Sequence, residues 1–145
     1  MTVASILGHK SGTKLVSCEP SDSLEFLSQL LAEHRIGVIF IVDDNGALVG
    51  IVSERDIVRN MASDGTAMFN NTAADIMTRK VVTCLPSDTV TMLMGLMTEN
   101  RIRHIPVVVD GNIEGVISIG DVVKARIAAA EREAAEMMQY ISSAG

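Results

Sequence analysis

The chain has 145 residues, a formal net charge of −6, 48% hydrophobic residues and only 3% aromatic residues. This length corresponds to about one domain, and no apolar run approaches the ~18 residues of a membrane span. An acidic chain with few aromatic rings is a poor candidate for nucleic-acid binding. The N-terminus lacks the basic start and long apolar stretch of a signal peptide, so we expect a cytoplasmic protein with no membrane association.

The first half of the chain is predicted to form a short helix, then strand, helix, strand, strand and helix. Asp22 and Glu25 have the spacing of a capping box at the start of the first long helix. Asp43-Asp44-Asn45-Gly46 is typical of a hairpin turn. The segments predicted around these signals are a helix at 3–7, strands at 14–18, 37–42 and 47–52, and helices from 20 and from 53 to about 61.

The second half repeats this order of elements and ends in a longer helix. The predicted segments are a helix at 73–77, strands at 80–84, 105–109 and 113–117, a helix at 89–99 and a helix from 118. Nothing breaks the last helix between Asp121 and about Ile141. Its apolar residues have near-heptad spacing, which predicts packing on its own domain or on a second copy; they are Ile127, Ala130, Ala134, Met137, Met138 and Ile141.

The two halves share sequence as well as element order. The segment 16–22 (VSCEPSD) returns 66 positions later at 82–88 (VTCLPSD), and 50–56 (GIVSERD) returns 65 positions later at 115–121 (GVISIGD). Two copies of this length predict a pseudo-symmetric pair, not a solenoid. Cys18 and Cys84 occupy equivalent positions, where we expect free buried thiols. The expected boundaries are repeat one at 1–62, a linker at 63–72, repeat two at 73–127 and a C-terminal helical extension at 128–145.

A Gly-x-x-Ser-x-x-Asp pattern marks the predicted strand-to-helix junction of both repeats. The glycine permits close approach to the backbone, and the serine sits where a helix N-terminus favours an anion. The aspartate, one turn further, can accept hydrogen bonds from a ribose diol. The same pattern is also an ordinary helix cap, but its recurrence at equivalent positions favours a nucleotide site.

These residues resemble the tandem cystathionine-β-synthase (CBS) domain family, the Bateman module. The resemblance covers about residues 2–127 and rests on the two repeats of 16–24, 35–43 and 50–56 with 75–86, 101–108 and 115–121. It implies an α/β fold of the α+β type, with two β-α-β-β-α repeats packed through their sheets plus the long C-terminal helix. It is similar to the small stand-alone bacterial members with no attached enzyme.

The resemblance also implies two clefts between the repeats, each binding an adenosine nucleotide such as AMP, ATP or NAD as a ligand, with no cofactor required. In each, the aspartate would hold the ribose, the serine the phosphate and the apolar strands the adenine. The first site would combine Lys14, Val16, Gly37, Val38 and Ile39 with Ser118 and Asp121. The second would combine Thr78, Lys80, Val82, Arg103, His104 and Ile105 with Ser53, Arg55 and Asp56.

The repeats differ in residues expected near phosphate. Repeat two has Arg103 and His104 where repeat one has Gly37 and Val38, and Arg55 corresponds to Gly120. The two sites are therefore expected to differ in affinity or ligand, with phosphate met by Arg55, Arg103 and His104. Copy one also lacks the proline found at Pro106. The alternative for Arg103 is a solvated surface charge. The alternative for His104 is a side chain that forms a hydrogen bond with the backbone.

The sequence predicts a regulatory nucleotide-binding module, not an enzyme, because no catalytic triad or metal-ligand spacing is visible. It predicts a homodimer and an unidentified effector protein. The alternative is a ligand-free dimerising scaffold for a partner protein, and a minor one is nucleic-acid binding through residues 101–104.

Overall fold

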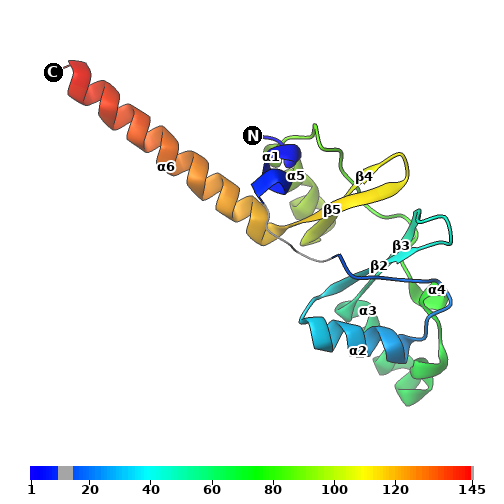
Figure 1. Cartoon of the computed structure of the whole chain (residues 1–145). Helices are drawn as coiled ribbons and strands as arrows, with labels where there is room; N and C mark the ends of the chain where they lie inside the picture. The colour runs from blue at the N-terminus through cyan, green and yellow to red at the C-terminus, as the bar shows by residue number, and fades with distance from the viewer. Residues whose placement is uncertain (10–14, 145) are drawn as a thin grey trace. The chain divides into compact units, whose positions relative to one another are not determined.

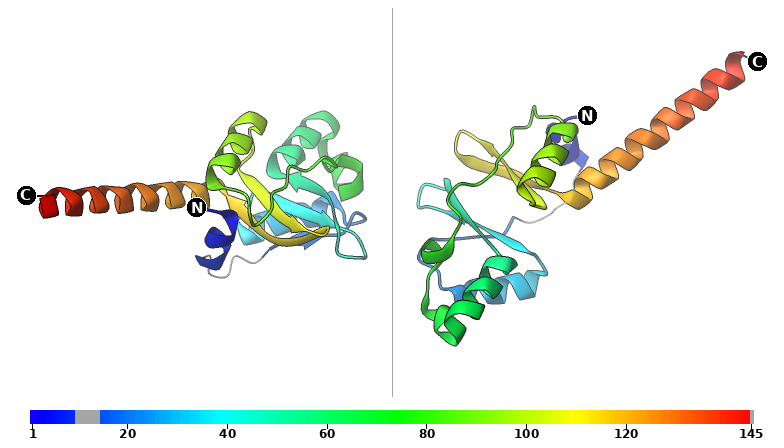
Figure 2. Two further views of the ribbon diagram at one scale, coloured as in Figure 1. Left: turned by 90° about the horizontal axis from the view of Figure 1, so that it is seen from above. Right: turned by 180° about the vertical axis from the view of Figure 1, so that it is seen from behind.

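The computed structural model describes residues 1–9 and 15–144, and it groups them into two compact units (Figures 1 and 2). Of the described residues, unit 1 contains 1–9, 84–107 and 115–144, and unit 2 contains 15–83 and 108–114. The elements are α1 (Val3–His9), β1 (Ser17–Cys18), α2 (Leu24–His34), β2 (Val38–Val42), β3 (Leu48–Ser53), α3 (Glu54–Asp64), η1 (Gly65–Asn70), α4 (Ala73–Ile76), α5 (Val90–Asn100), β4 (His104–Val109), β5 (Asn112–Ser118) and α6 (Ile119–Ala144).

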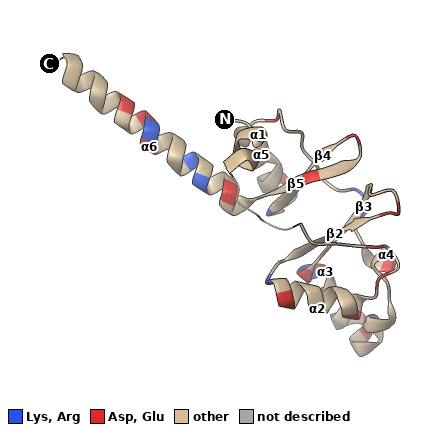
Figure 3. Cartoon of the chain, viewed as in Figure 1, with Lys and Arg blue, Asp and Glu red and all other residues tan. Residues whose placement is uncertain are grey.

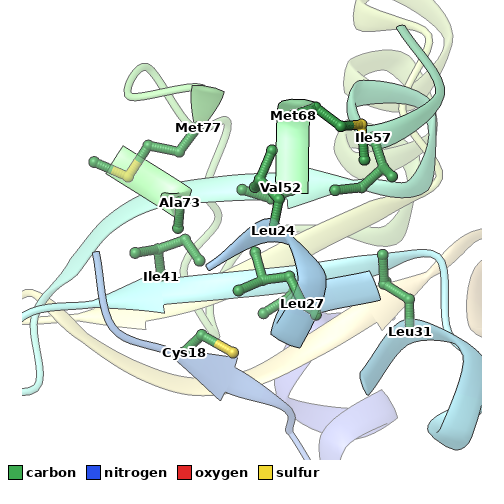
Figure 4. Close-up of a cluster of buried hydrophobic side chains, with 11 residues drawn as sticks. Cys18, Leu24, Leu27, Leu31, Ile41, Val52, Ile57, Met68, Ala73 and Met77 are labelled. Carbon is green, nitrogen blue, oxygen red and sulfur yellow. The ribbon is translucent and has the colours of Figure 1, made fainter. Parts of the chain in front are cut away.

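Unit 2 is built on a three-stranded sheet in the order β1-β2-β3. β1 pairs with β2 in parallel, and β2 pairs with β3 as an antiparallel hairpin in which Val38 lies opposite Ser53. The predicted turn forms because the Asp43 carboxylate accepts hydrogen bonds from the amides of Asn45 and Ala47, both at 2.9 Å. One face of the sheet packs on α2, α3 and α4 around a buried cluster (Figure 4): Cys18, Leu24, Leu27, Leu31, Ile39, Ile41, Val52, Ile57, Met68, Ala73 and Met77.

Unit 1 has the equivalent core around the two-stranded sheet of β4 and β5. Its buried cluster is Val3, Ile6, Cys84, Val90, Leu93, Met97, Ile105, Val107, Ile117 and Val122. The strand predicted at 80–84 is wrong in extent, because only Cys84 makes a parallel bridge, to Val107. The mixed α/β fold with two equivalent repeats and a long, unbroken C-terminal helix is confirmed.

Two local predictions need correction. The cap of α2 is Ser23, whose hydroxyl accepts from the Phe26 amide at 3.2 Å. Asp22 instead lies in the preceding turn, where its carboxylate accepts a hydrogen bond from the Glu19 amide at 2.8 Å. The short side chain of an aspartate can reach a backbone amide of its own turn, and this contact competes with helix capping. The residues expected to form a loop at 63–72 largely form the end of α3 and the 3₁₀ helix η1, whose Met68 is fully buried.

The two short helices pack on the repeats that they do not precede in the sequence. α1, which comes before repeat one, places Val3 and Ile6 in the core that repeat two builds. α4, which comes before repeat two, places Ala73 in the core that repeat one builds. The core of each compact unit is therefore built from one repeat and the short helix that lies ahead of the other repeat.

Candidate functional site

The junction of β3 and α3 in unit 2 carries Ser53 and Asp56 in a reciprocal capping box. The Ser53 hydroxyl accepts from the Asp56 amide at 3.2 Å, and Asp56 Oδ2 accepts from the Ser53 amide at 2.9 Å and from the Ser53 hydroxyl at 3.0 Å. Asp56 Oδ1 is 3.6 Å from the guanidinium of Arg59, which is 71% exposed. A 3.6 Å contact to a guanidinium this exposed is weak, so Oδ1 is the carboxylate atom that can accept from a further hydrogen-bond donor.

The junction of β5 and α6 in unit 1 has the same geometry. Asp121 Oδ2 accepts from the Ser118 amide at 2.8 Å, and the Ser118 hydroxyl accepts from the Asp121 amide at 3.1 Å. Both carboxylates are half-buried at the start of a helix, where the helix dipole favours negative charge. The capping role that the sequence pattern allowed is thus present in both repeats, and it fixes the two carboxylates in equivalent positions.

The predicted strand residues of repeat one lie beside the junction of the same repeat. The Glu54 amide donates to the Gly37 carbonyl at 2.9 Å, and the Phe40 amide donates to the Val16 carbonyl at 3.3 Å. Repeat two matches this arrangement, since the Ile119 amide donates to the Arg103 carbonyl at 2.8 Å. The Glu54–Gly37 and Ile119–Arg103 bonds place the start of the middle strand against the first turn of the following helix in each repeat, and the Phe40–Val16 bond joins β1 to β2.

Not every predicted residue can offer a side chain to a ligand. Ile39 and Ile105 are fully buried in the two cores, so only their backbone groups could contribute to a site. Val16 and Val38 are half-buried, as is His104, while Arg55 and Arg103 are exposed. Lys14 lies outside the described residues.

Thr78 lies next to the junction of unit 2. Thr78 and Ile51 exchange two backbone hydrogen bonds, at 2.9 and 3.0 Å, so that Thr78 extends the edge of β3 just before Ser53. Lys80 is exposed and Val82 is half-buried further along the same segment. The structure therefore places Thr78 next to the Ser53 junction. The assignment of these residues to one ligand site, and the sharing of each site between the repeats, stay predictions.

The glycine of each junction motif is covered by an apolar side chain that the sequence did not assign to the site. A Cβ at Gly50 would lie 2.5 Å from the Met77 sulfur, and a Cβ at Gly115 would lie 2.8 Å from Leu7 Cδ2. The close approach predicted for these glycines is therefore made by a neighbouring side chain. The equivalence of Leu7, in α1, and Met77, directly after α4, was the available signal, because both follow the same apolar spacing.

The two cysteines are free, buried and equivalent. Burial, and then the charge of Asp22 or Asp88, raises the pKa of each thiol from 9.0 to about 11. Both thiols are consequently protonated at neutral pH, in the form that neither attacks as a nucleophile nor binds metal. Within the described residues, no group of three or more His, Cys, Asp or Glu side chains is placed to hold a metal ion.

Comparison with known proteins identifies the family. The family model of the CBS domain matches residues 7–63 and 73–128, which together cover most of the chain. The chain belongs to the CBS domain family and carries two CBS domains. It is 36% identical over 128 residues to the mitochondrial CBS domain-containing protein CBSX3 of Arabidopsis thaliana, covering 86% of this chain and 62% of that protein.

Solved structures of CBS-domain proteins share the fold. The CBS-domain protein ATU1752 of Agrobacterium tumefaciens is 38% identical with a TM-score of 0.80, covering 86% of this chain and 92% of that one. CBSX2, solved in complex with AMP, is 26% identical with a TM-score of 0.75 over 89% and 98% of the two chains. The CBS domain pair of MJ0100, solved with 5′-methylthioadenosine and S-adenosyl-L-methionine, is 26% identical with a TM-score of 0.74 over 86% and 98%.

Within the described residues, no helix has the length and hydropathy of a membrane span.

Proposed function

We propose that this chain is a non-catalytic regulatory module that binds an adenosine nucleotide, of the AMP, ATP or NAD type, at its two serine-aspartate junctions. The observation that carries the proposal is the duplicated capping box, which presents a half-buried carboxylate at the same point of both repeats. The adenosine ligands of the CBSX2 and MJ0100 structures support the same ligand class. An effector protein would respond to the nucleotide-bound state.

The ribose contact is assigned to the aspartate of each junction. A carboxylate offers about four acceptor positions, and Oδ2 of Asp56 uses two of them on Ser53. Among the described residues, the remaining atom, Oδ1, has only the long contact to the exposed Arg59. A ribose hydroxyl that donates to Oδ1 would displace a weak surface pair and leave the helix cap intact.

The phosphate contact of repeat one is assigned first to Arg55. The amides of Glu54 and Asp56 donate to Gly37 and to Ser53. The Arg55 amide is therefore the donor of this first turn that has no partner within the part of the chain that the structure describes, and it could donate to an anion. The guanidinium of Arg55 is exposed, so the same residue offers a second donor group. The Ser53 hydroxyl donates to Asp56, and it would have to exchange that bond to contact phosphate.

A thermal-shift screen tests the ligand class. AMP, ATP and NAD are added at millimolar concentration, with GMP and GTP as base controls. Ligand at a hundredfold excess over Kd stabilises the folded state by about 2.7 kcal/mol, which raises Tm by several degrees. The absence of a shift with every adenosine nucleotide would contradict the proposal and favour a ligand-free scaffold.

Single substitutions then test the site. Asp56→Ala and Asp121→Ala should each remove one binding event in titration calorimetry. Asp75→Ala is the matched control, because Asp75 Oδ2 makes the same capping contacts, at 2.8 and 3.1 Å, with Thr72 at the start of α4. This control should lose similar capping stability yet retain both binding events. Two unchanged events in the Asp56 and Asp121 variants would show that the ribose assignment is wrong.

A further inference from the structure

The part of α6 beyond residue 125 lies outside the core of its own unit. Ala125 is the last residue of this helix that packs against the buried cluster of unit 1, and every residue from Ala130 to Ala144 is exposed. Figure 1 shows this segment extending away from α1 and α5 of the same unit. Because isolated helices of this length are marginally stable in water, an apolar face on it requires a partner.

One face of this segment carries apolar residues with strict heptad spacing. Steps of four and three residues alternate without interruption along Val123, Ile127, Ala130, Ala134, Met137, Ile141 and Ala144. The large side chains on this stripe are highly exposed: Ile127 by 53%, Met137 by 57% and Ile141 by 64%. A period of 3.5 residues stays on one face only when two helices supercoil around each other.

The charges that flank the stripe fit a second copy of the same helix in parallel. With Ile127 at position a and Ala130 at position d, Arg126 falls at position g and Glu131 at position e. Position g of one helix faces position e of the next heptad in a parallel pair, so Arg126 meets Glu131 of the second copy twice. Glu133 meets the uncharged Met138. Figure 3 shows the basic and acidic residues along α6.

An antiparallel pair fits the stripe and its charges less well. With Ala130 opposite Ala134, Glu131 would face Glu131 and Glu133 would face Glu133 of the second copy, and like charges at these positions are unfavourable. A shift of one heptad, with Ala134 opposite Met137, removes this repulsion but pairs no opposite charges. The opposite shift, with Ile127 opposite Ala130, pairs Lys124 with Glu131 and Arg126 with Glu133, but it leaves Met137, Ile141 and Ala144 beyond the exposed segment of the second copy. The parallel arrangement is the one of these registers that pairs opposite charges and also buries the whole stripe.

We propose that residues 123–144 of α6 pair with the same residues of a second copy as a parallel two-stranded coiled coil. The pairing buries the exposed stripe and joins two nucleotide-binding modules through their C-terminal helices. It does not depend on the proposed ligand.

Sedimentation of the full chain tests the interface. Wild type is expected to be dimeric at micromolar concentration, and Ile127→Glu should raise the dimer Kd at least a hundredfold, because it places a charge in the seam. Ala128→Glu is the matched control, since it adds the same charge one position outside the stripe, and it should retain the dimer. A monomeric wild type, or an Ile127→Glu dimer with unchanged Kd, would overturn the proposal.

Disulfide crosslinking and charge exchange test the orientation. Ala144→Cys lies on the stripe and should form a disulfide-linked dimer under mild oxidation, whereas the outward Ser142→Cys should not. Arg126→Glu should weaken the dimer roughly tenfold, and Arg126→Glu with Glu131→Arg should restore it. A retained dimer that gives no crosslink through Ala144→Cys would exclude the parallel arrangement.

Discussion

The two repeats differ least in their cores and most at their surfaces. Leu27 and Leu93 are equivalent and fully buried, as are Ile39 and Ile105, and both junctions make the same capping bonds. Positions outside the buried cores have diverged: the half-buried Gly37 corresponds to the exposed Arg103, and Arg55 corresponds to Gly120, both exposed. Burial constrains size and polarity closely, whereas an exposed side chain can change at little cost in stability. Differences in ligand preference between the repeats should therefore arise from the exposed positions.

The largest expected effect tests whether the two cores are equally stable. Leu27→Ala and Leu93→Ala should each reduce the free energy of unfolding by about 2–5 kcal/mol, because each leaves a cavity in a closed core. Urea denaturation measures the loss. The exposed residues one position earlier provide controls: Phe26→Ala and Met92→Ala should cost far less. A large difference between Leu27→Ala and Leu93→Ala would show that the cores are unequal.

Alkaline pH should destabilise both repeats alike. The pKa of each buried thiol is raised from 9.0 to about 11, so the folded state holds its proton more tightly than the unfolded state. This stabilisation is complete below pH 9 and is lost as the pH rises through 11. It amounts to about 2–3 kcal/mol for each thiol.

Denaturation between pH 8 and 11 measures this loss. Cys18→Ala and Cys84→Ala should each remove half of the pH dependence that the thiols cause. A pH dependence that is unchanged in both variants would contradict the assignment.

The junction glycines should tolerate a methyl group unequally. Gly50→Ala would bring Cβ within 3.1 Å of three Met77 atoms, one of them Met77 Cβ, whereas Gly115→Ala closely meets only the terminal Cδ2 of Leu7. A flexible chain end moves aside more easily than Cβ. We therefore expect Gly50→Ala to reduce the free energy of unfolding by about 2–3 kcal/mol and Gly115→Ala to reduce it by about 1 kcal/mol. Thermal unfolding measures both values.

A double variant locates the cause of that cost. If Met77 is the obstacle, Gly50→Ala with Met77→Ala should be less destabilising than the sum of the two single changes. Simple additivity would show that another contact limits Gly50.

The smallest effect concerns the phosphate side of the proposed sites. Arg55→Ala should weaken ATP binding at one site about fivefold and leave adenosine binding unchanged, because the guanidinium is assigned to phosphate alone. Gly120→Arg should strengthen ATP binding at the other site. Calorimetry with ATP and adenosine measures both. An equal loss for the two ligands would place Arg55 outside the phosphate contact.

The sequence predicted those elements whose signals are local. The Asp43–Gly46 turn, the capping serines of α3 and α6 and the unbroken last helix all follow from spacing within a few residues. The sequence did not predict features that depend on competition between side chains or on contacts between segments far apart in the chain. Ser23 takes the cap of α2 because Asp22 is engaged with Glu19, and the strand expected at 80–84 has a partner only at Cys84.

The same distinction applies to the candidate site. The sequence identified Ser53 and Asp56 because their pattern is repeated at Ser118 and Asp121. Met77 over Gly50 and Leu7 over Gly115 are contacts between segments far apart in the chain. No periodicity encodes which short helix packs on which repeat, so sequence reasoning placed each helix with its own repeat.

The exchange of α1 and α4 between the units has a consequence for dissection of the chain. A fragment cut between the repeats would keep a short helix that belongs to the other core and would lack the helix that closes its own. Two identical copies of such a half could each supply the missing helix to the other, by reciprocal domain swapping.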